Sequence, residues 1–210
     1  MEIDLKSYIL SHCNKIFLKD DVHGLRLRAV WRIPINEKQI SKMLDLRIYP
    51  DPILRVKMLP VVNFDPDNLS PIVDKMAELM YNYKGIGIAA PQIGICQRIC
   101  VFDIGEGKQV LINPEIMESE GEDMLEEGCL SIPGIRINIK RAKSIVVRGY
   151  NIEGKEEEFK ADGLLARVIQ HEVDHLNGIL VVDKLPPSDR LKFHLLYKQK
   201  TDETKPGVLF

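Results

Sequence analysis

Hydrophobic residues recur at helical spacing in two long stretches of the chain. The first, residues 70–85, opens with Ser70-Pro71, a hydroxyl N-cap followed by a proline at the first helical position. The second, residues 164–176, contains no proline or glycine and is followed by Gly178, a residue type common just past a helix end. Both stretches are therefore predicted to be helices with one apolar face.

Between these helices the pattern changes to the two-residue period of strands. Strands are predicted near residues 95–104 and 109–113, joined by a glycine-containing turn at 105–107. A hairpin is predicted from residues 144–150 and 157–160, because a turn sequence separates them. The chain is thus expected to contain both helices and antiparallel strands.

The two ends of the chain carry weaker patterns. Residues 190–197 predict a last amphipathic helix, with Leu191, His194 and Leu195 near one face. Residues 25–33 alternate between apolar and mostly basic positions, which suits either a strand or an unstructured leader.

Composition narrows the class of protein. With 210 residues and 45% hydrophobic content, the chain can bury a sizeable core, as one domain with an appendage. A formal net charge of −2 and the lack of a long basic run give no support for nucleic-acid binding. No apolar run approaches the length of a membrane span, and the first residues lack the pattern of a secretory signal.

The predicted helix at 164–176 carries the strongest candidates for chemistry. His171 and His175 are four residues apart, so both imidazoles lie on one helical face and can bind one metal ion. Glu172 is one residue off that face, close enough to move protons without being a ligand. The alternative is a pair of surface histidines on an ordinary helix. The apolar surroundings argue against it, because buried histidines need a partner.

A catalytic metal site of this kind needs a third protein ligand. The pattern that places a third histidine after the helix is excluded, because that position is Val181. Glu203 is the only downstream glutamate, and it lies in a charged tail. Cys129, flanked by a glycine and a loop that ends in proline, is the better candidate for a Cys-His-His set.

A glycine-rich stretch, residues 85–92, ends in Gln92. Its small residues allow another backbone to approach closely, and Gln92 would supply an amide at its end. Taken alone, this stretch is equally consistent with a tight helix-to-strand turn that exposes the glutamine.

Together, these three stretches resemble the peptide deformylase family. Gly85-Ile86-Gly87-Ile88-Ala89-Ala90-Pro91-Gln92 is similar to the family's Gly-φ-Gly-φ-Ala-Ala-x-Gln element. Glu127-Gly128-Cys129-Leu130-Ser131 is similar to its cysteine element, and residues 170–178 to its metal-binding helix. The elements occur in the family's order, and the resemblance covers about residues 44–197.

The resemblance implies a fold and an activity. The fold is α+β, with antiparallel β-sheets wrapped around a central metal-binding helix, an N-terminal helix and a C-terminal helix. The activity is metal-dependent hydrolysis of the formyl group from N-formylmethionine at the start of new polypeptides. Cys129, His171 and His175 would bind one divalent ion, Fe²⁺ by analogy with the family, with Zn²⁺, Ni²⁺ or Co²⁺ as substitutes.

Roles for other residues follow from the same resemblance. Glu172 would take a proton from the attacking water and pass it to the leaving amine. The Gln92 amide and the Leu130 backbone N–H would stabilise the oxyanion. The residues expected to bind the peptide are Ile86, Leu164 and Val168 as an apolar pocket for methionine, Gly87 through its backbone, and Arg136.

The resemblance also implies an organisation and a setting. Residues 1–42 would be an N-terminal extension, 43–200 the catalytic domain and 201–210 a polar tail. The partners would be N-formylmethionyl nascent peptides, with the ribosome near its exit tunnel as a second candidate. No nucleic acid or membrane is expected as a partner, on the charge and the apolar runs given above. A bacterial cytoplasm is the expected location, or an organelle if residues 1–42 act as a leader.

Two alternatives stay open from the residues alone. A metallopeptidase could use the same helix in a cleft that accepts internal peptide bonds. A closed structural metal site would instead need a fourth protein ligand, for which the candidates are Cys96, Cys100 and His194.

Overall fold

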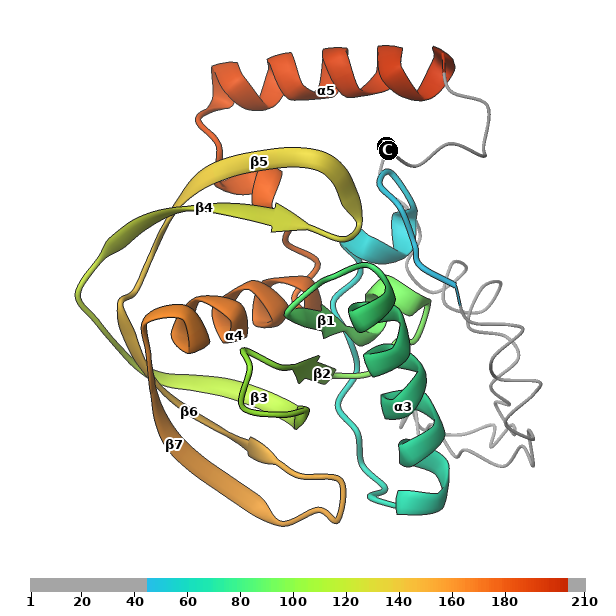
Figure 1. The fold of residues 1–210 in the computed structure, drawn as a ribbon, viewed down its shortest axis with the longest axis vertical. Helices are drawn as coiled ribbons and strands as arrows, with labels where there is room; N and C mark the ends of the chain where they lie inside the picture. The colour runs from blue at the N-terminus through green and yellow to red at the C-terminus, as the bar shows by residue number, and fades with distance from the viewer. Residues whose placement is uncertain (1–44, 204–210) are drawn as a thin grey trace, which may run out of the picture.

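The computed structural model describes residues 45–203, so the pattern at residues 25–33 lies outside the described part. Helix α4 (Gly163–Leu176) lies at the centre, between two antiparallel sheets (Figure 1). The larger sheet has the order β1 (Gly87–Ala89), β2 (Ile99–Phe102), β3 (Gln109–Glu120), β6 (Ser144–Tyr150) and β7 (Glu156–Asp162). The smaller sheet pairs β4 (Asp123–Cys129) with β5 (Ile132–Arg141).

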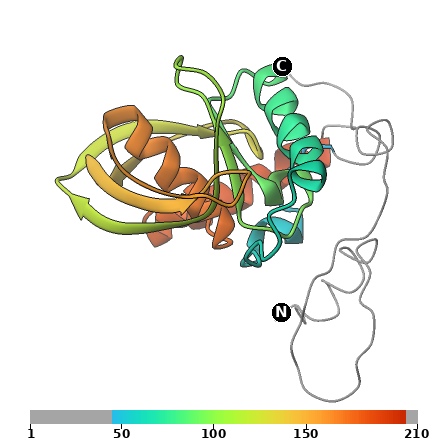
Figure 2. The ribbon, with the colours of Figure 1, turned by 90° about the horizontal axis from the view of Figure 1, so that it is seen from below.

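Further helices complete the described fold. Helix α3 (Pro66–Asn82) packs beside β1 and β2, at the end of the sheet away from β7 (Figures 1 and 2). Helix α5 (Pro187–Glu203) lies beyond β5 (Figure 1). Three short 3₁₀ helices are η1 (Pro52–Arg55), η2 (Ala90–Ile93) and η3 (Val181–Lys184). This is the α+β arrangement that the family resemblance implies, with sheets around the metal-binding helix.

The predicted central helix is confirmed, and its apolar residues explain its position. Ala166, Ile169 and Val173 belong to the core cluster that includes residues of the larger sheet, whereas Leu176 packs in the cluster that includes Cys129. Gly178 has φ +73°, and a Cβ there would lie 2.6 Å from the Arg55 carbonyl oxygen. The glycine therefore ends the helix and also lets η1 approach it closely.

The predicted start of α3 is wrong by five residues. Asp65 is the N-cap, its carboxylate accepting from the Asp67 N–H at 3.1 Å, and Pro71 lies inside the helix. Asp65-Pro66 satisfies the same rule as Ser70-Pro71, a polar cap followed by proline, one turn and a half earlier. The helix ends at Asn82 rather than at Gly85, because the left-handed residue is Lys84 (φ +56°).

The predicted amphipathic face of the last helix is also wrong. Among the α5 side chains that the structure describes, residues 187–197, Phe193 and Tyr197 are buried, whereas Leu191 and Leu195 are exposed. The aromatic residues pack around Tyr49, whose hydroxyl lies 2.8 Å from His194 Nδ1. A partner from the start of the described chain, which local periodicity cannot reveal, thus decides which face is buried.

The hairpin predicted near 144–160 is confirmed as β6 and β7, which pair from Ser144 with Asp162 to Tyr150 with Glu156. The other two strands differ from prediction in length: β2 is shorter, and β3 extends to Glu120. No helix of the described part is long and apolar enough to cross a membrane.

Helix α3 gives a test of the core. Met76 is fully buried in the cluster shared by α3, β1 and β2. Met76→Ala is expected to lower the free energy of unfolding by about 2–5 kcal/mol, because it leaves a cavity there. Urea titration measures this loss. Met117→Ala removes the same side chain from an exposed position and is expected to cost less than about 1 kcal/mol; equal losses would contradict the packing described.

Candidate active site

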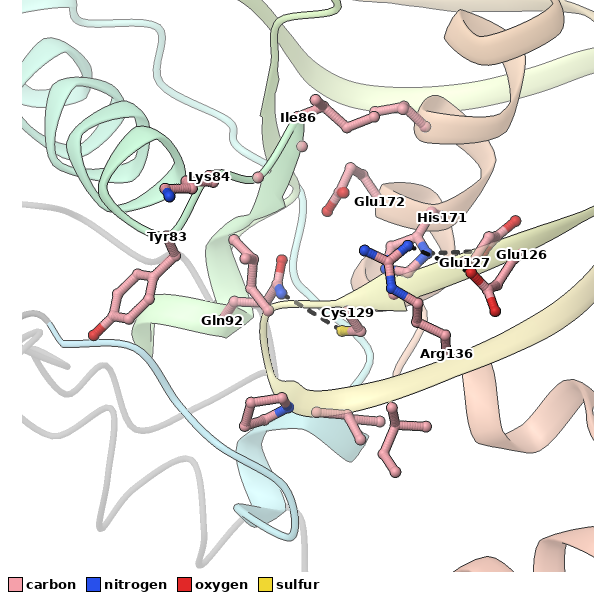
Figure 3. Close-up of a pocket in the computed structure, with 18 of the residues that line it drawn as sticks. Tyr83, Lys84, Ile86, Gln92, Glu126, Glu127, Cys129, Arg136, His171 and Glu172 are labelled. Atoms are coloured by element: carbon pink, nitrogen blue, oxygen red, sulfur yellow. Dashed lines mark hydrogen bonds and ion pairs between the residues drawn. The ribbon is translucent and has the colours of Figure 1, made fainter. Parts of the chain in front are cut away.

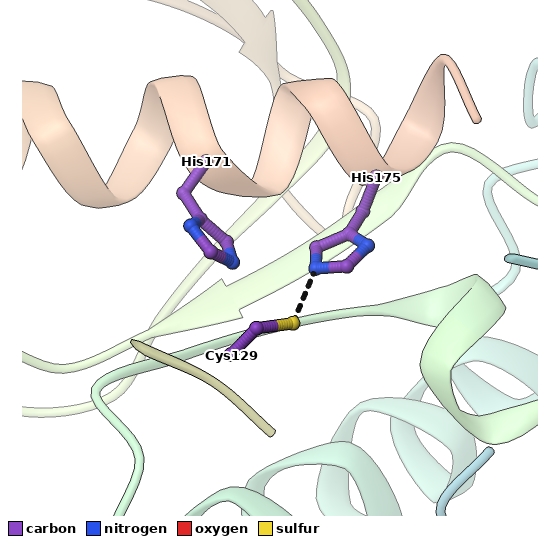
Figure 4. A group of neighbouring side chains, drawn as sticks. All are labelled: Cys129, His171 and His175. Carbon is purple, nitrogen blue, oxygen red and sulfur yellow. Dashed lines mark hydrogen bonds between the residues drawn. The ribbon is translucent and has the colours of Figure 1, made fainter. Parts of the chain in front are cut away.

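Three sulfur and nitrogen donors meet between the two sheets. Cys129 is the last residue of β4, and His171 and His175 extend from one face of α4 towards it (Figure 4). One ligand atom from each lies within 4.8 Å of the others, and Cys129 Sγ is 3.2 Å from His175 Nε2. All three side chains are buried. The structure therefore brings together the three ligands that the sequence predicts.

The donor set fits a divalent transition-metal ion. A thiolate and two imidazoles are ligands typical of Zn²⁺ and Fe²⁺, and three protein ligands leave one position open. Of the three candidates for a fourth ligand, Cys100 Sγ donates to the Leu111 carbonyl oxygen at 3.3 Å and His194 contacts Tyr49, and Cys96 is not part of the donor group. Within residues 45–197, no fourth cysteine, histidine or carboxylate joins the group. A closed structural site is therefore not supported.

Burial and neighbouring charges set the protonation of the histidines. Burial, together with the charge of His171, lowers the pKa of His175 well below 6.5, so this imidazole is neutral at pH 7. Burial also lowers the pKa of His171, but hydrogen bonds with Cys129 and Glu127 outweigh it and raise that pKa to about 10. A metal ion at these ligands competes with the His171 proton, so binding releases it.

Glu172 faces the same space from α4. Its carboxylate is buried, and among the described residues its Oε2 has no hydrogen-bond partner. Burial raises its pKa to about 7. It is not part of the donor group, which leaves this carboxylate available to a small molecule between it and the three ligands.

Gln92 approaches from the other side, on η2 (Figure 3). Its Oε1 accepts from the Ala89 N–H at 2.7 Å, and its Nε2 donates to Ser131 Oγ at 3.2 Å. Nε2 also lies 3.9 Å from Cys129 Sγ. The Ala89 N–H therefore fixes the amide so that its NH₂ group points to the three ligands. The exposed glutamine that the glycine-rich stretch also allowed is excluded, since Gln92 is buried.

Comparison with known proteins adds a second line of evidence. The family model described as polypeptide deformylase matches residues 43–191. The chain belongs to the peptide deformylase family. Its activity is that of a peptide deformylase.

Individual relatives agree with this assignment. A peptide deformylase of Thermotoga petrophila is 48% identical over 161 residues, which cover 76% of this chain and 96% of the relative. One of Halothermothrix orenii is 50% identical over 145 residues, 68% of this chain and 94% of the relative. The crystal structure of the Thermotoga maritima peptide deformylase superposes with a TM-score of 0.67 at 46% identity, covering 69% of this chain and 99% of that one.

The residues expected to bind the peptide line one cleft of about 880 Å³ beside the deformylase ligand set (Figure 3). Val168 is buried, whereas Ile86 and Leu164 are partly open to solvent. The lining includes Gly87, Ile86, Leu164, Val168, Arg136, Gln92, Leu130 and Glu172. Arg136 is exposed and pairs with Glu126 at 3.5 Å. His175 is the one predicted site residue outside the lining, and its Nε2 lies 3.2 Å from Cys129 Sγ.

Sequence reasoning missed the role of Glu127. It is buried, and its Oε2 lies 3.0 Å from His171 Nδ1, so the Nε2 of His171 is left for a metal. Burial raises the pKa of this carboxyl, but hydrogen bonds from His171 and Arg141 outweigh it and lower the pKa to about 2. A signal existed: Glu127 is two residues before Cys129, and alternate residues of a strand share a face.

Arg141, Arg167 and Ser131 were missed as well. Arg167 is four residues before His171 on α4, so the helical period places it on the ligand face. Arg141 offers no comparable signal, because its contact with Glu127 depends on the pairing of β4 with β5.

Proposed function

We propose that this protein removes the formyl group from N-formylmethionine at the start of new polypeptides, releasing formate. The observation that carries this proposal is the Cys129–His171–His175 set beside an open cleft, faced by the Glu172 carboxylate, whose Oε2 has no hydrogen-bond partner in the described part of the chain. A buried carboxylate next to a three-ligand metal site suits hydrolysis of a carbonyl compound.

A divalent ion bound by these ligands would act as a Lewis acid and lower the pKa of water. We propose Fe²⁺ as the native ion, with Zn²⁺, Ni²⁺ or Co²⁺ as substitutes, since imidazole and thiolate donors accept all four. This part of the proposal is tested by comparing formate release after loading with each ion.

The chain's own residues would move the protons. Glu172 takes one from water as the oxygen attacks the formyl carbon, because Oε2 has no other partner among the described residues. When the C–N bond breaks, Glu172 gives that proton to the leaving amine. The products are formate and a peptide with a free N-terminal amine.

Two donors would stabilise the negative charge on the formyl oxygen. Gln92 points its NH₂ group into the site because the Ala89 N–H holds its Oε1. Leu130 follows Cys129 directly, and its backbone N–H is the second donor that we propose. Donors held in place before the reaction stabilise a transition state more than mobile ones do.

Substrate binding would rest on apolar contact and backbone pairing. Ile86, Leu164 and Val168 line the part of the cleft that we propose for the methionine side chain. Gly87, at the start of β1, offers backbone groups to an extended peptide, and Arg136 lines the same cleft from β5. The partners proposed are formylated nascent peptides and, as the place of encounter, the ribosome near its exit tunnel.

The function is tested with a short formylmethionyl peptide and anaerobically prepared, metal-loaded protein. Formate and all peptide products are quantified together. Formate with an intact peptide chain is the expected result. Cleavage of internal peptide bonds without formate would identify a broader metallopeptidase and overturn the proposal.

A further inference from the structure

We propose that Arg167 is a positioning residue for the metal site. It holds Glu127, and through it His171, in the orientation that retains the ion. The inference rests on the metal-dependent function proposed above, and it concerns a residue that lines the cleft without being a ligand: its side chain hydrogen-bonds to Glu127 and is not part of the Cys129–His171–His175 group.

The first observation is how Glu127 is held. Its Oε1 accepts from Arg141 Nε at 2.7 Å and from Arg167 Nη1 at 2.7 Å. Its Oε2 accepts from Arg141 Nη2 at 2.9 Å and lies 3.0 Å from His171 Nδ1. Each oxygen therefore has two partners. With Arg167 on Oε1, the carboxylate cannot rotate without losing a hydrogen bond, so Oε2 stays aimed at His171.

The second observation is that Arg141 alone does not fix the orientation of the Glu127 carboxylate. Its Nη1 donates to Asp174 Oδ2 at 2.7 Å, so Arg141 is shared between two carboxylates. Arg167 brings a second buried guanidinium; within residues 45–197 its one carboxylate hydrogen bond is to Glu127, whereas Asp123 Oδ2 lies farther away, 3.9 Å from Nη2. Without Arg167, Arg141 could shift towards Asp174 and carry Glu127 with it.

The third observation concerns the two elements that carry the ligands. Arg167 lies on α4 with both histidines, and its Nη1 donates to the Ile139 carbonyl oxygen at 2.9 Å. Its Nη2 donates to the Asp123 carbonyl oxygen at 3.0 Å. These carbonyls belong to β5 and β4, the pair that carries Cys129. Arg167 therefore fixes the helix against the sheet as well as fixing Glu127.

A purely structural role is the competing explanation, and Arg98 provides its control. Arg98 Nη1 donates to Leu176 O at 3.3 Å, and Nη2 donates to Pro114 O at 3.1 Å. It thus joins the other end of α4 to β3 through carbonyl oxygens, as Arg167 does with β4 and β5. Arg98 makes no contact with Glu127 in the described structure. Its variants therefore show the effect of losing hydrogen bonds between α4 and a strand without any effect on Glu127.

The experiment uses the full chain loaded with Co²⁺, whose visible absorption reports ligand geometry. Wild type, Arg167→Lys, Arg167→Met, Arg98→Lys and Arg98→Met are compared. The rate at which excess chelator removes Co²⁺, the absorption spectrum, Tm, kcat and KM are measured. Lysine keeps the charge but loses the fork of donors, so it separates geometry from charge.

We expect Co²⁺ to leave both Arg167 variants about 10–100-fold faster than wild type, because loss of an outer partner of a metal ligand lowers metal affinity by about this factor. Their absorption bands should shift, and kcat should fall more than KM rises. The Tm of the Arg98 variants should fall by a similar amount, whereas their Co²⁺ release rates and absorption spectra should equal those of wild type. If Arg167→Met does not fold, Arg167→Lys carries the test.

If folded Arg167→Lys protein releases Co²⁺ at the wild-type rate and shows the wild-type spectrum, the inference is wrong. The proposed function would be unaffected by that result. Failure of the wild-type protein itself to bind Co²⁺ would overturn both. The two failures are therefore distinguishable within one set of measurements.

Discussion

Glu172→Gln is expected to lower kcat for formate release by about 10²–10⁴-fold while the protein keeps its metal ion. The amide has nearly the same shape as the carboxylate, so the buried position should accept it without loss of fold. It cannot take a proton from water or return one to the amine. Because Glu172 is not part of the Cys129–His171–His175 group, metal binding should persist.

Steady-state kinetics on a formylmethionyl peptide and metal analysis of the same samples measure both effects. Glu126→Gln is the matched control, since Glu126 is an exposed carboxylate on the lining of the same cleft. Its kcat should stay within about threefold of wild type, as for a surface substitution. Loss of the metal from Glu172→Gln would show that Glu172 is a ligand. An unchanged kcat would show that Glu172 does not take part in the reaction.

Gly87→Ala is expected to lower kcat/KM by about 100-fold, although it adds only one methyl group. A Cβ at Gly87 would lie 2.4 Å from Glu172 Oε1 and 2.8 Å from Val168 Cγ1. Glu172 must then turn away or α4 must shift, and a displacement of about 1 Å at a catalytic group costs a factor of this size. Overpacking should also lower the free energy of unfolding by about 1–3 kcal/mol.

Gly128→Ala gives the comparison for this methyl group. Gly128 lines the same cleft from β4, and the nearest atom to its added Cβ is Ile135 O at 3.8 Å, an ordinary contact. The free energy of unfolding, measured by urea titration, should therefore change by less than about 0.5 kcal/mol, and kcat/KM should fall much less than for Gly87→Ala. Wild-type kinetics in Gly87→Ala would contradict the close approach of β1 to α4.

The family motifs also carried information that no local pattern holds. Cys129 is 42 residues before His171 in the chain, yet it is one of the three ligands. Periodicity placed the two histidines together, but Cys129 joined them only through elimination of other ligands and through the order of the motifs. The structure adds the reason for their meeting: side chains of α4 reach the β4–β5 pair, where Arg167 donates to the Ile139 carbonyl oxygen and His171 Nδ1 lies 3.0 Å from Glu127 Oε2.

Features that depend on residues close together in the chain were predicted from the sequence. The helix with His171 and His175, its end at Gly178 and the β6–β7 hairpin follow from spacing and turn residues, which act over a few residues. Features that depend on distant partners were not. Only the tertiary structure showed that Phe193 is buried instead of Leu191. Only the tertiary structure showed that Arg167 hydrogen-bonds to Glu127. Packing between segments far apart in the chain selects the buried face and the charge partner, and local periodicity contains neither.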